Sequence, residues 1–269
     1  MGALSALASG RTPRIRRRWL RPIDGVDAGV TTRSWQLVDR LAVALANARL
    51  VRRLDALSIG TITAFARAID ANSAWTAGHS ERVTHRRCGC EALELSEPER
   101  ERLQRGALLH DIGKLGVPAS IVNKPGRLSD QERTIMQAHP TLGVTILQPI
   151  GAFADILPII RSHHERLDGM GYPDGLSGST IPYLARVLSV ADVYDALVSD
   201  RPYRAGMEPA VAAAVIRADV GSSFDPHIAQ VFLALHDRGE IEALRAVDAP
   251  ATALADAVGH TRLILQESA

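Results

Sequence analysis

Five of the nine histidines in this sequence stand in short polar segments of a kind that can bind metal ions. A lone histidine is more often structural than a ligand, but several such segments considered together favour a shared site. The segments are GHS (78–80), LLHDIGK (108–114), AHP (138–140) and HHERLDG (163–169). The other histidines lack such neighbours and are expected to be surface or core residues: His85, His227, His236 and His260.

The segment LLHDIGK places two polar side chains directly after an apolar run. His110 and Asp111 follow GALL, which predicts a buried helix, and burying such groups costs several kcal/mol unless they are paired, hydrogen-bonded or bound to a metal. Neighbouring side chains diverge by about 100° on a helix. We therefore expect both residues to flank one cation while the carboxylate reaches a second. Lys114 lies one turn after His110, so its ammonium is expected to point toward an anion held by the metals.

Adjacent histidines diverge in the same way, but at a helix end His163 and His164 can both bind metal. Imidazole and carboxylate ligands suit Fe, Mn, Zn or similar ions, and the absence of thiolates argues against a structural zinc site. A bridging carboxylate among many imidazoles suggests two ions about 3.5–4 Å apart, an arrangement that activates a water molecule and clamps a phosphoryl group.

The segment ARVLSVADVYDALVSDRPYR (185–204) adds one acid and two bases to this set. Asp192 lies within an apolar helix, so its carboxylate needs a partner. Arg201 and Arg204 follow that helix, and guanidinium groups bind phosphate bidentately and stack on bases. For either arginine alone, a solvated charge pair at a helix end is an equally good explanation.

Helical periodicity dominates the elements that must position these residues. Residues 34–59 contain no Gly or Pro, and the apolar spacing predicts one long amphipathic helix that either packs on the following domain or pairs with a second copy. Ser96 and Ser129 are predicted N-caps. Strand patterns are nearly absent, so we predict an all-α fold. Further helices are expected near 61–74, 79–94, 97–109, 129–147, 153–163, 183–199, 207–217 and 225–237, with loops at 123–129 and 168–180.

Composition is that of an ordinary globular chain, with 46% apolar and 23% charged residues. The net charge of +1 gives no reason to expect a nucleic-acid polymer as partner. Residues 1–33 contain the basic run RTPRIRRRWLRP and are expected to be disordered, with an anionic-surface contact as the alternative. No segment approaches the about 20 apolar residues of a membrane span. Cys88 and Cys90 suit helix packing better than zinc or a disulfide, and we expect a cytoplasmic chain.

The order H…HD…H…HH…GYP…D resembles the HD-GYP subgroup of HD-domain metal-dependent phosphohydrolases. HDIGK and HHERLDGMGYP match nearly letter for letter, and the resemblance runs from about Ile59 to Leu235 through TAGHSERV, KPGRLS, RVLSVADVYDAL, SDRPYR and SSFDP. It implies an HD-domain helical bundle over residues 60–238. It also implies hydrolysis of cyclic di-GMP to pGpG or GMP in bacterial second-messenger signalling, at two divalent ions, Fe or Mn.

The resemblance also assigns roles by position. One ion would be held by His79, His110, Asp111 and Asp192, and Asp111 would bridge to a second ion held by His139, His163 and His164. Asp111 and Lys114 would be catalytic, with Lys114 assisting at the scissile phosphate. The dinucleotide would contact Lys114, Gly171, Tyr172, Pro173, Arg201 and Arg204.

Two positions depart from the pattern that the resemblance implies. Members with a third ion carry a glutamate four residues before the first histidine, where this chain has Trp75, which cannot act as a ligand. We therefore expect two ions. Gly89 replaces a better helix former in RVTHRRCGCEAL, at a cost of about 1 kcal/mol that should not destroy the site.

The segment DRLAVALANARLVRRLDAL (39–57) resembles the closing helix of a GAF sensor domain, although ordinary helix chemistry explains it almost as well. Residues 34–59 would then be a linker helix from a sensor that is trimmed here or encoded in a longer reading frame. A homodimer through this helix and a partner signalling protein are further expectations. Residues 239–269 are expected to form loop and weak helix.

Two other functions fit the same residues. The chain could be a cyclic di-GMP receptor or adaptor with little turnover. It could also hydrolyse another cyclic dinucleotide or a nucleotide phosphate, because a metal core does not by itself select the base.

Overall fold

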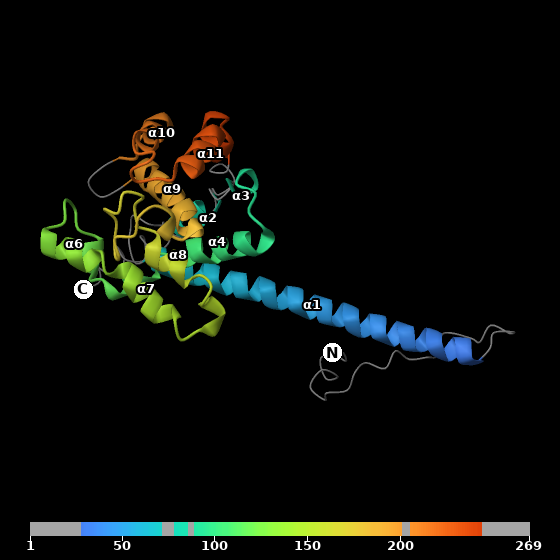
Figure 1. The fold of residues 1–269 in the computed structure, drawn as a ribbon. Helices are drawn as coiled ribbons and strands as arrows, with labels where there is room; N and C mark the ends of the chain where they lie inside the picture. The colour runs from blue at the N-terminus through green and yellow to red at the C-terminus, as the bar shows by residue number, and fades with distance from the viewer. Residues whose placement is uncertain (1–27, 72–77, 86–88, 201–204, 244–269) are drawn as a thin grey trace, which may run out of the picture. The chain divides into compact units, whose positions relative to one another are not determined.

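A computed structural model describes residues 28–71, 78–85, 89–200 and 205–243. These residues form helices and contain no β-strand, only isolated bridges, which confirms the predicted all-α fold. The chain divides into two compact units, residues 1–56 and 57–269. The described site residues all lie in the second unit (Figure 1). No helix among the described residues is long and apolar enough to cross a membrane.

The first helix, α1 (Ala28–Ala71), continues through Gly60 and joins the two helices expected at 34–59 and 61–74. One glycine costs only about 1 kcal/mol in a helix interior, which the neighbouring helix formers outweigh. In the second unit, α1 contributes Ile62, Ala66 and Ile69 to the core. The leucines of the predicted apolar stripe, including Leu41 and Leu54, are exposed, and their pairing with a second copy stays a prediction.

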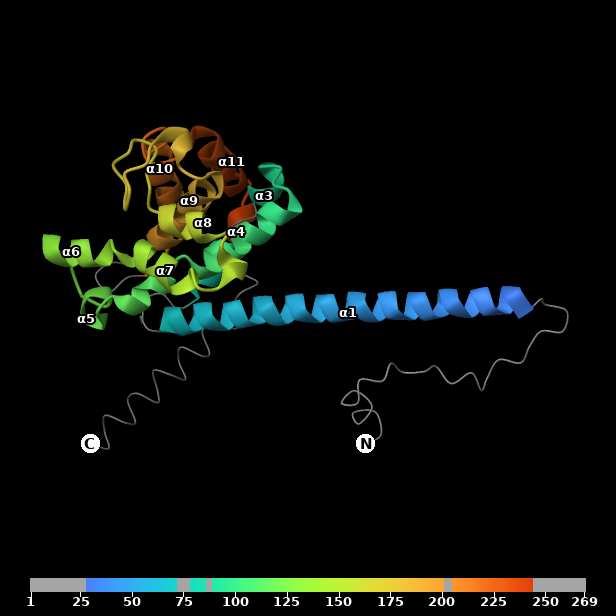
Figure 2. The same cartoon turned by 60° about the horizontal axis from the view of Figure 1, so that its bottom comes forward.

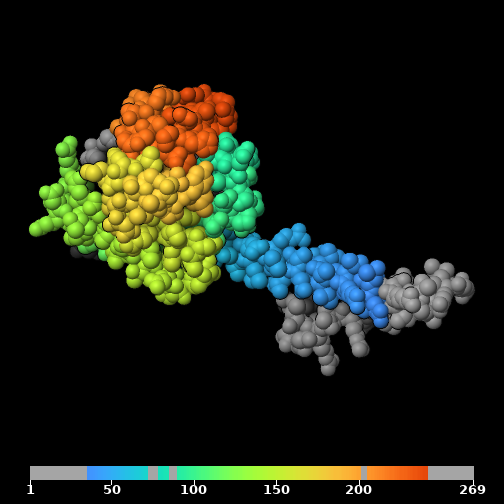
Figure 3. All heavy atoms as spheres, in the orientation of Figure 1, coloured from blue at the N-terminus to red at the C-terminus, as the bar shows by residue number. Residues whose placement is uncertain are grey.

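Helix α9 (Tyr183–Val198) lies at the centre of the second unit and has 11 buried residues. In Figures 1 and 2, α10 (Pro209–Ala218) and α11 (Pro226–Asp237) lie on one side of α9, while α4 (Glu97–Leu109) and α8 (Leu157–Ser162) lie on the other. Helix α2 (His79–His85) also contacts α9. The atoms of α9, α10 and α11 form one continuous surface in Figure 3.

Shorter elements connect these helices. They are α3 (Gly89–Ala92), η4 (Ile112–Gly116), α5 (Ala119–Val122), α6 (Asp130–Met136), α7 (His139–Leu147), η5 (Gly151–Phe153), η6 (Gly178–Thr180) and α12 (Glu240–Ala243). The expected helix at 79–94 is thus two helices, α2 and α3, and Gly89 begins the second of them. The expected helix at 153–163 begins only at Leu157.

The expected helix at 129–147 is also wrong, because it is divided into α6 and α7. Pro140 explains the division. Proline has no N–H to donate to the carbonyl four residues earlier, which here is that of Met136. The carbonyl left free becomes a partner for a site residue, as described below.

The helix starts after Ser96 and Ser129 were predicted correctly. Ser96 precedes α4, and its N–H donates to Oε2 of Glu99 at 2.9 Å. Ser129 precedes α6, where its hydroxyl accepts from the N–H of Glu132 and its own N–H donates back to the Glu132 carboxylate. Both are capping boxes, which satisfy the free N–H groups of a first helical turn.

Candidate metal centre

The end of α4 brings His110 and Asp111 to one centre. The α-helix stops at Leu109, and Asp111, with φ −94° and ψ 5°, precedes the 3-10 helix η4. Nε2 of His110 lies 3.4 Å from Oδ2 of Asp111. The two side-chain ends thus lie close enough to flank one cation, as the sequence predicted.

Three histidines are oriented in the same way, each by the backbone carbonyl three residues earlier. Each follows the end of a helix, where the last carbonyls lack intrahelical partners. A carbonyl only accepts, so each Nδ1 carries the proton and each Nε2 offers its lone pair. The pairs, at 2.7–2.8 Å, are His110 with Ala107, His139 with Met136, and His163 with Ile160.

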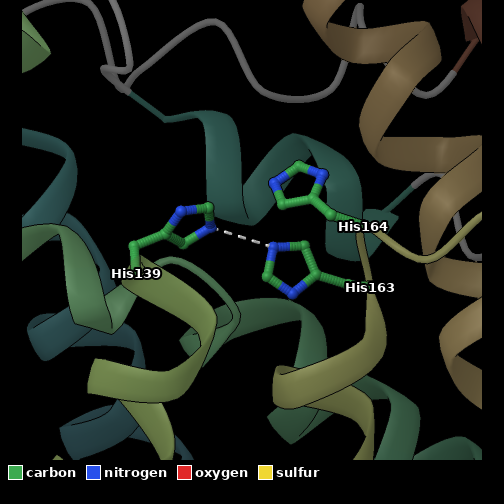
Figure 4. Close-up of side chains that lie close together, drawn as sticks. All are labelled: His139, His163 and His164. Carbon is green, nitrogen blue, oxygen red and sulfur yellow. Dashed lines mark hydrogen bonds between the residues drawn. The ribbon is translucent and has the colours of Figure 1, made fainter. Parts of the chain in front are cut away.

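Two of these lone pairs face each other. Nε2 of His139 lies 3.2 Å from Nε2 of His163, the contact marked in Figure 4. Burial lowers the pKa of His139 and holds the pKa of His163 well below its usual value, so a proton between the rings is disfavoured. Two buried lone pairs that face each other favour a metal cation between the rings.

His164 completes what we call the second donor set, which consists of His139, His163 and His164. Their ligand atoms lie within 4.8 Å of one another, and Figure 4 shows the three rings gathered together. Burial lowers the pKa of His164 to about 3. The set is therefore neutral near pH 7, which is the protonation state that binds metal.

The first donor set consists of His79, His110 and Asp192, contributed by α2, the end of α4 and α9. Oδ1 of Asp192 lies 3.1 Å from Nε2 of His79 and 3.8 Å from Nε2 of His110. Burial raises the pKa of Asp192, but the hydrogen bond and charges of the surrounding histidines outweigh it and hold the pKa well below its usual range. The carboxylate is thus ionised in this place.

Asp111 lies between the two sets. Its Oδ2 is 3.4 Å from Nε2 of His110, and its Oδ1 is 3.4 Å from Nε2 of His139. Burial raises the pKa of Asp111, but Lys114 and the surrounding histidines hold it well below its usual value. Each carboxylate oxygen thus faces a different donor set, which is the placement that a bridging ligand requires.

These residues fit divalent metal ions. Nε2 of His110 and Oδ1 of Asp111 are buried and have no hydrogen-bond partner, although such atoms are costly in a protein interior. The two sets offer imidazole nitrogens and carboxylate oxygens without a thiolate, a combination that suits Fe, Mn or Zn. When bound, a pair of such ions supplies Lewis acidity that activates water and stabilises charge on a phosphoryl group.

Lys114 was expected one α-helical turn after His110. It lies instead in the 3-10 helix η4. Its Nζ donates to Oδ2 of Asp111 at 2.5 Å. The ammonium therefore lies at the edge of the first donor set. Its role at a scissile phosphate stays a prediction.

Gly113 ties η4 to α7. A Cβ at this glycine would lie 1.8 Å from the carbonyl oxygen of His139 and 2.6 Å from the N–H nitrogen of Gly143. Only glycine permits this backbone approach. The contact fixes the distance between the chain segment that carries Asp111 and the one that carries His139.

The GYP segment lies against the second donor set. The ring of Tyr172 stacks on His164 with centroids 4.7 Å apart, and its N–H donates to the His164 carbonyl at 3.2 Å. A Cβ at Gly171 would lie 2.4–2.6 Å from the backbone of residues 164–166. Burial raises the pKa of Tyr172, so its hydroxyl keeps its proton as a potential donor. Pro173 follows Tyr172 in the same loop.

Sequence reasoning missed three residues that shape the site: Gly113, Glu165 and Asp195. Glu165 is buried and accepts from the N–H groups of Asp174 and Leu176, at 2.7 and 3.0 Å, which anchors the GYP loop. Asp195 stands in the same apolar helix as Asp192, so the argument used for Asp192 could have found it.

Some predicted residues lie outside the described part of the chain. These are Trp75, Cys88, Arg201 and Arg204. Cys90 is buried in the core, as expected of a packing residue.

The chain belongs to the HD domain family, which matches it over residues 63–228. With HDIGK and HHERLDGMGYP in place, and with the relatives and solved neighbours below, it is a member of the HD-GYP subgroup, as the motifs indicated.

Two curated relatives illustrate the similarity. The chain is 42% identical over 166 residues to 3'3'-cGAMP-specific phosphodiesterase 3 of Vibrio cholerae, covering 61% of this chain and 36% of the relative. It is 40% identical over 176 residues to the cyclic di-GMP phosphodiesterase response regulator RpfG of Xanthomonas campestris, covering 64% of this chain and 47% of the relative. The chain thus spans between a third and a half of their length.

Two solved structures share the fold. The HDG"Y"P protein Bd1817 from Bdellovibrio bacteriovorus matches with a TM-score of 0.51 at 24% identity, over 60% of this chain and 52% of that one. The cyclic GMP-AMP specific phosphodiesterase V-cGAP3 of V. cholerae matches with a TM-score of 0.53 at 21% identity, over 74% and 52%.

Proposed function

We propose that this chain is a metal-dependent phosphodiesterase that hydrolyses a cyclic dinucleotide, cyclic di-GMP in particular, to pGpG, GMP or both. The observation that carries the proposal is the convergence of two donor sets on Asp111, whose oxygens face one set each. Family membership supports it, since curated relatives are named for the hydrolysis of cyclic dinucleotides.

Each group of site residues would have its own role in hydrolysis. The two donor sets and Asp111 would hold two ions, Fe or Mn. Lys114, whose ammonium lies 2.5 Å from Asp111, would exchange that contact for the scissile phosphate. Tyr172 would donate a hydrogen bond from its protonated hydroxyl at the rim of the second donor set. Arg201 and Arg204 would neutralise phosphate by bidentate contacts.

A second substrate, 3'3'-cGAMP, has its own support. One relative that is 42% identical to this chain is named as specific for that dinucleotide. The donor sets bind metal and phosphate rather than base, so they do not distinguish the two nucleotides. A receptor or adaptor role with little turnover is the alternative from a different class. A homodimer through residues 34–59 and a partner signalling protein complete the proposal.

The test is a metal and turnover measurement on one sample. Protein purified without oxygen is analysed for metal and then assayed with cyclic di-GMP, 3'3'-cGAMP and cyclic di-AMP. We expect two ions per chain and release of linear dinucleotide, reduced at least about 1,000-fold by Asp111→Asn. His227→Ala, at an exposed position on α11, is the matched control and should retain full activity. Tight nucleotide binding without hydrolysis by the two-ion form would favour the receptor instead.

A further inference from the structure

His79 is held differently from the three histidines that bind backbone carbonyls. Its Nδ1 lies 2.7 Å from Oδ2 of Asp195, a carboxylate 116 residues away on α9. Asp195 is fully buried, with 0% of its surface exposed. An ionised carboxylate only accepts hydrogen bonds, so Nδ1 carries the proton and Nε2 is left for the first donor set.

His79 takes its partner from a distant element, and its position at a helix start is one reason. His79 is the first residue of α2, whereas His110 and His163 directly follow the last residues of α4 and α8. The free backbone groups at a helix start are N–H donors, and those at a helix end are carbonyl acceptors. An imidazole N–H at a helix start therefore finds no free carbonyl in its own helix: His139, which begins α7, uses the end of α6, and His79 uses Asp195 on α9.

Asp195 is itself fixed on several sides. Nε of Arg82 donates to Oδ1 at 3.0 Å, and Nη2 of Arg82 donates to Oδ2 at 3.1 Å. The hydroxyl of Ser199 donates to Oδ2 at 3.2 Å. A buried carboxylate is tolerated when it is paired and hydrogen-bonded in this way. Arg82 also lies on α2, three residues after His79, so these two partners of Asp195 come from the same helix.

We propose that Asp195 is the positioning residue of the first donor set. It fixes the tautomer and the ring plane of His79, and so directs Nε2 toward Asp192 at 3.1 Å. It would hold α2 in place through Arg82 as well. In the second donor set, local carbonyls orient His139 and His163 instead. This proposal rests on the proposed function, since it concerns one of the two ions that function requires.

The test counts ions in the full-length chain. We expect Asp195→Ala to bind one ion where the unaltered chain binds two, with the ion of the second donor set retained. Asp195→Asn, whose amide oxygen still accepts from Nδ1, should keep two ions but bind the first about 10- to 100-fold more weakly. His227→Ala, at an exposed position on α11 away from both donor sets, is the control. It should keep both ions at wild-type affinity.

The readouts are metal content after anaerobic purification, titration with Mn²⁺ against a chelator, and melting temperature. Two tightly bound ions in Asp195→Ala would overturn the proposal. Equal weakening of both ions in Asp195→Asn would also overturn it, because a general structural role would then explain the loss. A different result would contradict the proposed function: an unaltered chain that holds two ions and hydrolyses none of the dinucleotides.

Discussion

The two donor sets contain similar ligands but are assembled by different means. In the second set, His139 and His163 are oriented by carbonyls three residues away, so the sequence near each histidine suffices. In the first set, His79 depends on Asp195, a partner 116 residues away. The same imidazole orientation can thus come from local helix ends or from the tertiary fold. The first set should therefore be the more sensitive to changes in distant helices.

The largest expected effect concerns the contact that joins the two sets. Gly113→Ala would place a Cβ 1.8 Å from the His139 carbonyl oxygen, and the backbones of η4 and α7 would have to separate. We expect a loss of at least about 4 kcal/mol in the free energy of unfolding, or failure to fold. Urea denaturation measures the loss.

The control for this variant is Gly151→Ala, where a Cβ would meet nothing within 4 Å. Its stability should change by less than about 1 kcal/mol. A Gly113→Ala protein of normal stability that binds both ions would show that the sets are not held together by this contact.

The next effect concerns the loop beside the second set. Glu165→Gln removes a buried charge that accepts from two N–H groups and leaves one of them facing an NH₂ group. We expect the loop to lose about 2 kcal/mol of stability. The KM for the dinucleotide should rise about tenfold while the ion content stays at two, as measured by steady-state kinetics and metal analysis.

Asp174→Asn, in the same loop, is the control. Its side chain pairs with Arg161 at a partly exposed position, so its loss should cost less than about 1 kcal/mol. A change in ion content in Glu165→Gln, with KM unaltered, would mean that the loop supports the ligands rather than the substrate.

A pH-dependent loss of stability is expected when the metal-free protein is acidified. The pKa values of His139, His163 and His164 are lowered by burial, that of His164 to about 3, whereas an unfolded histidine titrates near 6.5. The unfolded chain therefore binds protons that the folded chain does not. Stability is fully present above about pH 6.5 and is lost as the pH falls toward 3, by up to about 1.4 kcal/mol per pH unit for each histidine.

Urea denaturation of chelator-treated protein between pH 7.5 and 5 measures this loss. His164→Gln should reduce the slope, whereas His227→Gln, at an exposed position, should leave it unchanged. An unaltered slope in His164→Gln would show that the lowered pKa of His164 does not contribute.

The smallest effect tests whether the second set depends on its local helix. Ser129→Ala removes the cap of α6, the helix that ends at Met136 and supplies the carbonyl for His139. We expect a loss of about 1 kcal/mol, seen as a lower melting temperature. The ion of the second set should be weakened more than that of the first. Equal weakening of both ions would argue against local assembly.

Much of the fold was predictable because its signals are local. The bounds of α4, and those of α9 to within a residue, follow from apolar periodicity and from caps such as Ser96. The break before α7 was missed, although Pro140 gave a local signal for it. The continuation of α1 through Gly60 was missed because a single glycine was given more weight than its cost justifies.

The candidate ligands could be picked out from the sequence, and their supports could not. The positions of His79, Asp111 and Asp192 follow from motif resemblance, and the structure brings them together. Glu165 and Asp195 act through partners that only the folded chain places beside them. The roles of Lys114, Tyr172, Arg201 and Arg204 at a substrate stay predictions, as does a GAF origin of residues 39–57.

Pro140 supports the centre because it has no backbone N–H to donate. Almost any other residue there would bring an N–H that competes with His139 for the Met136 carbonyl, while making a continuous helix from Asp130 to Leu147 easier to form. An engineer seeking thermostability would choose that replacement on helix propensity alone. The redesigned protein would lose the fixed orientation of one ring, because the carbonyl that holds Nδ1 of His139 would acquire a second donor.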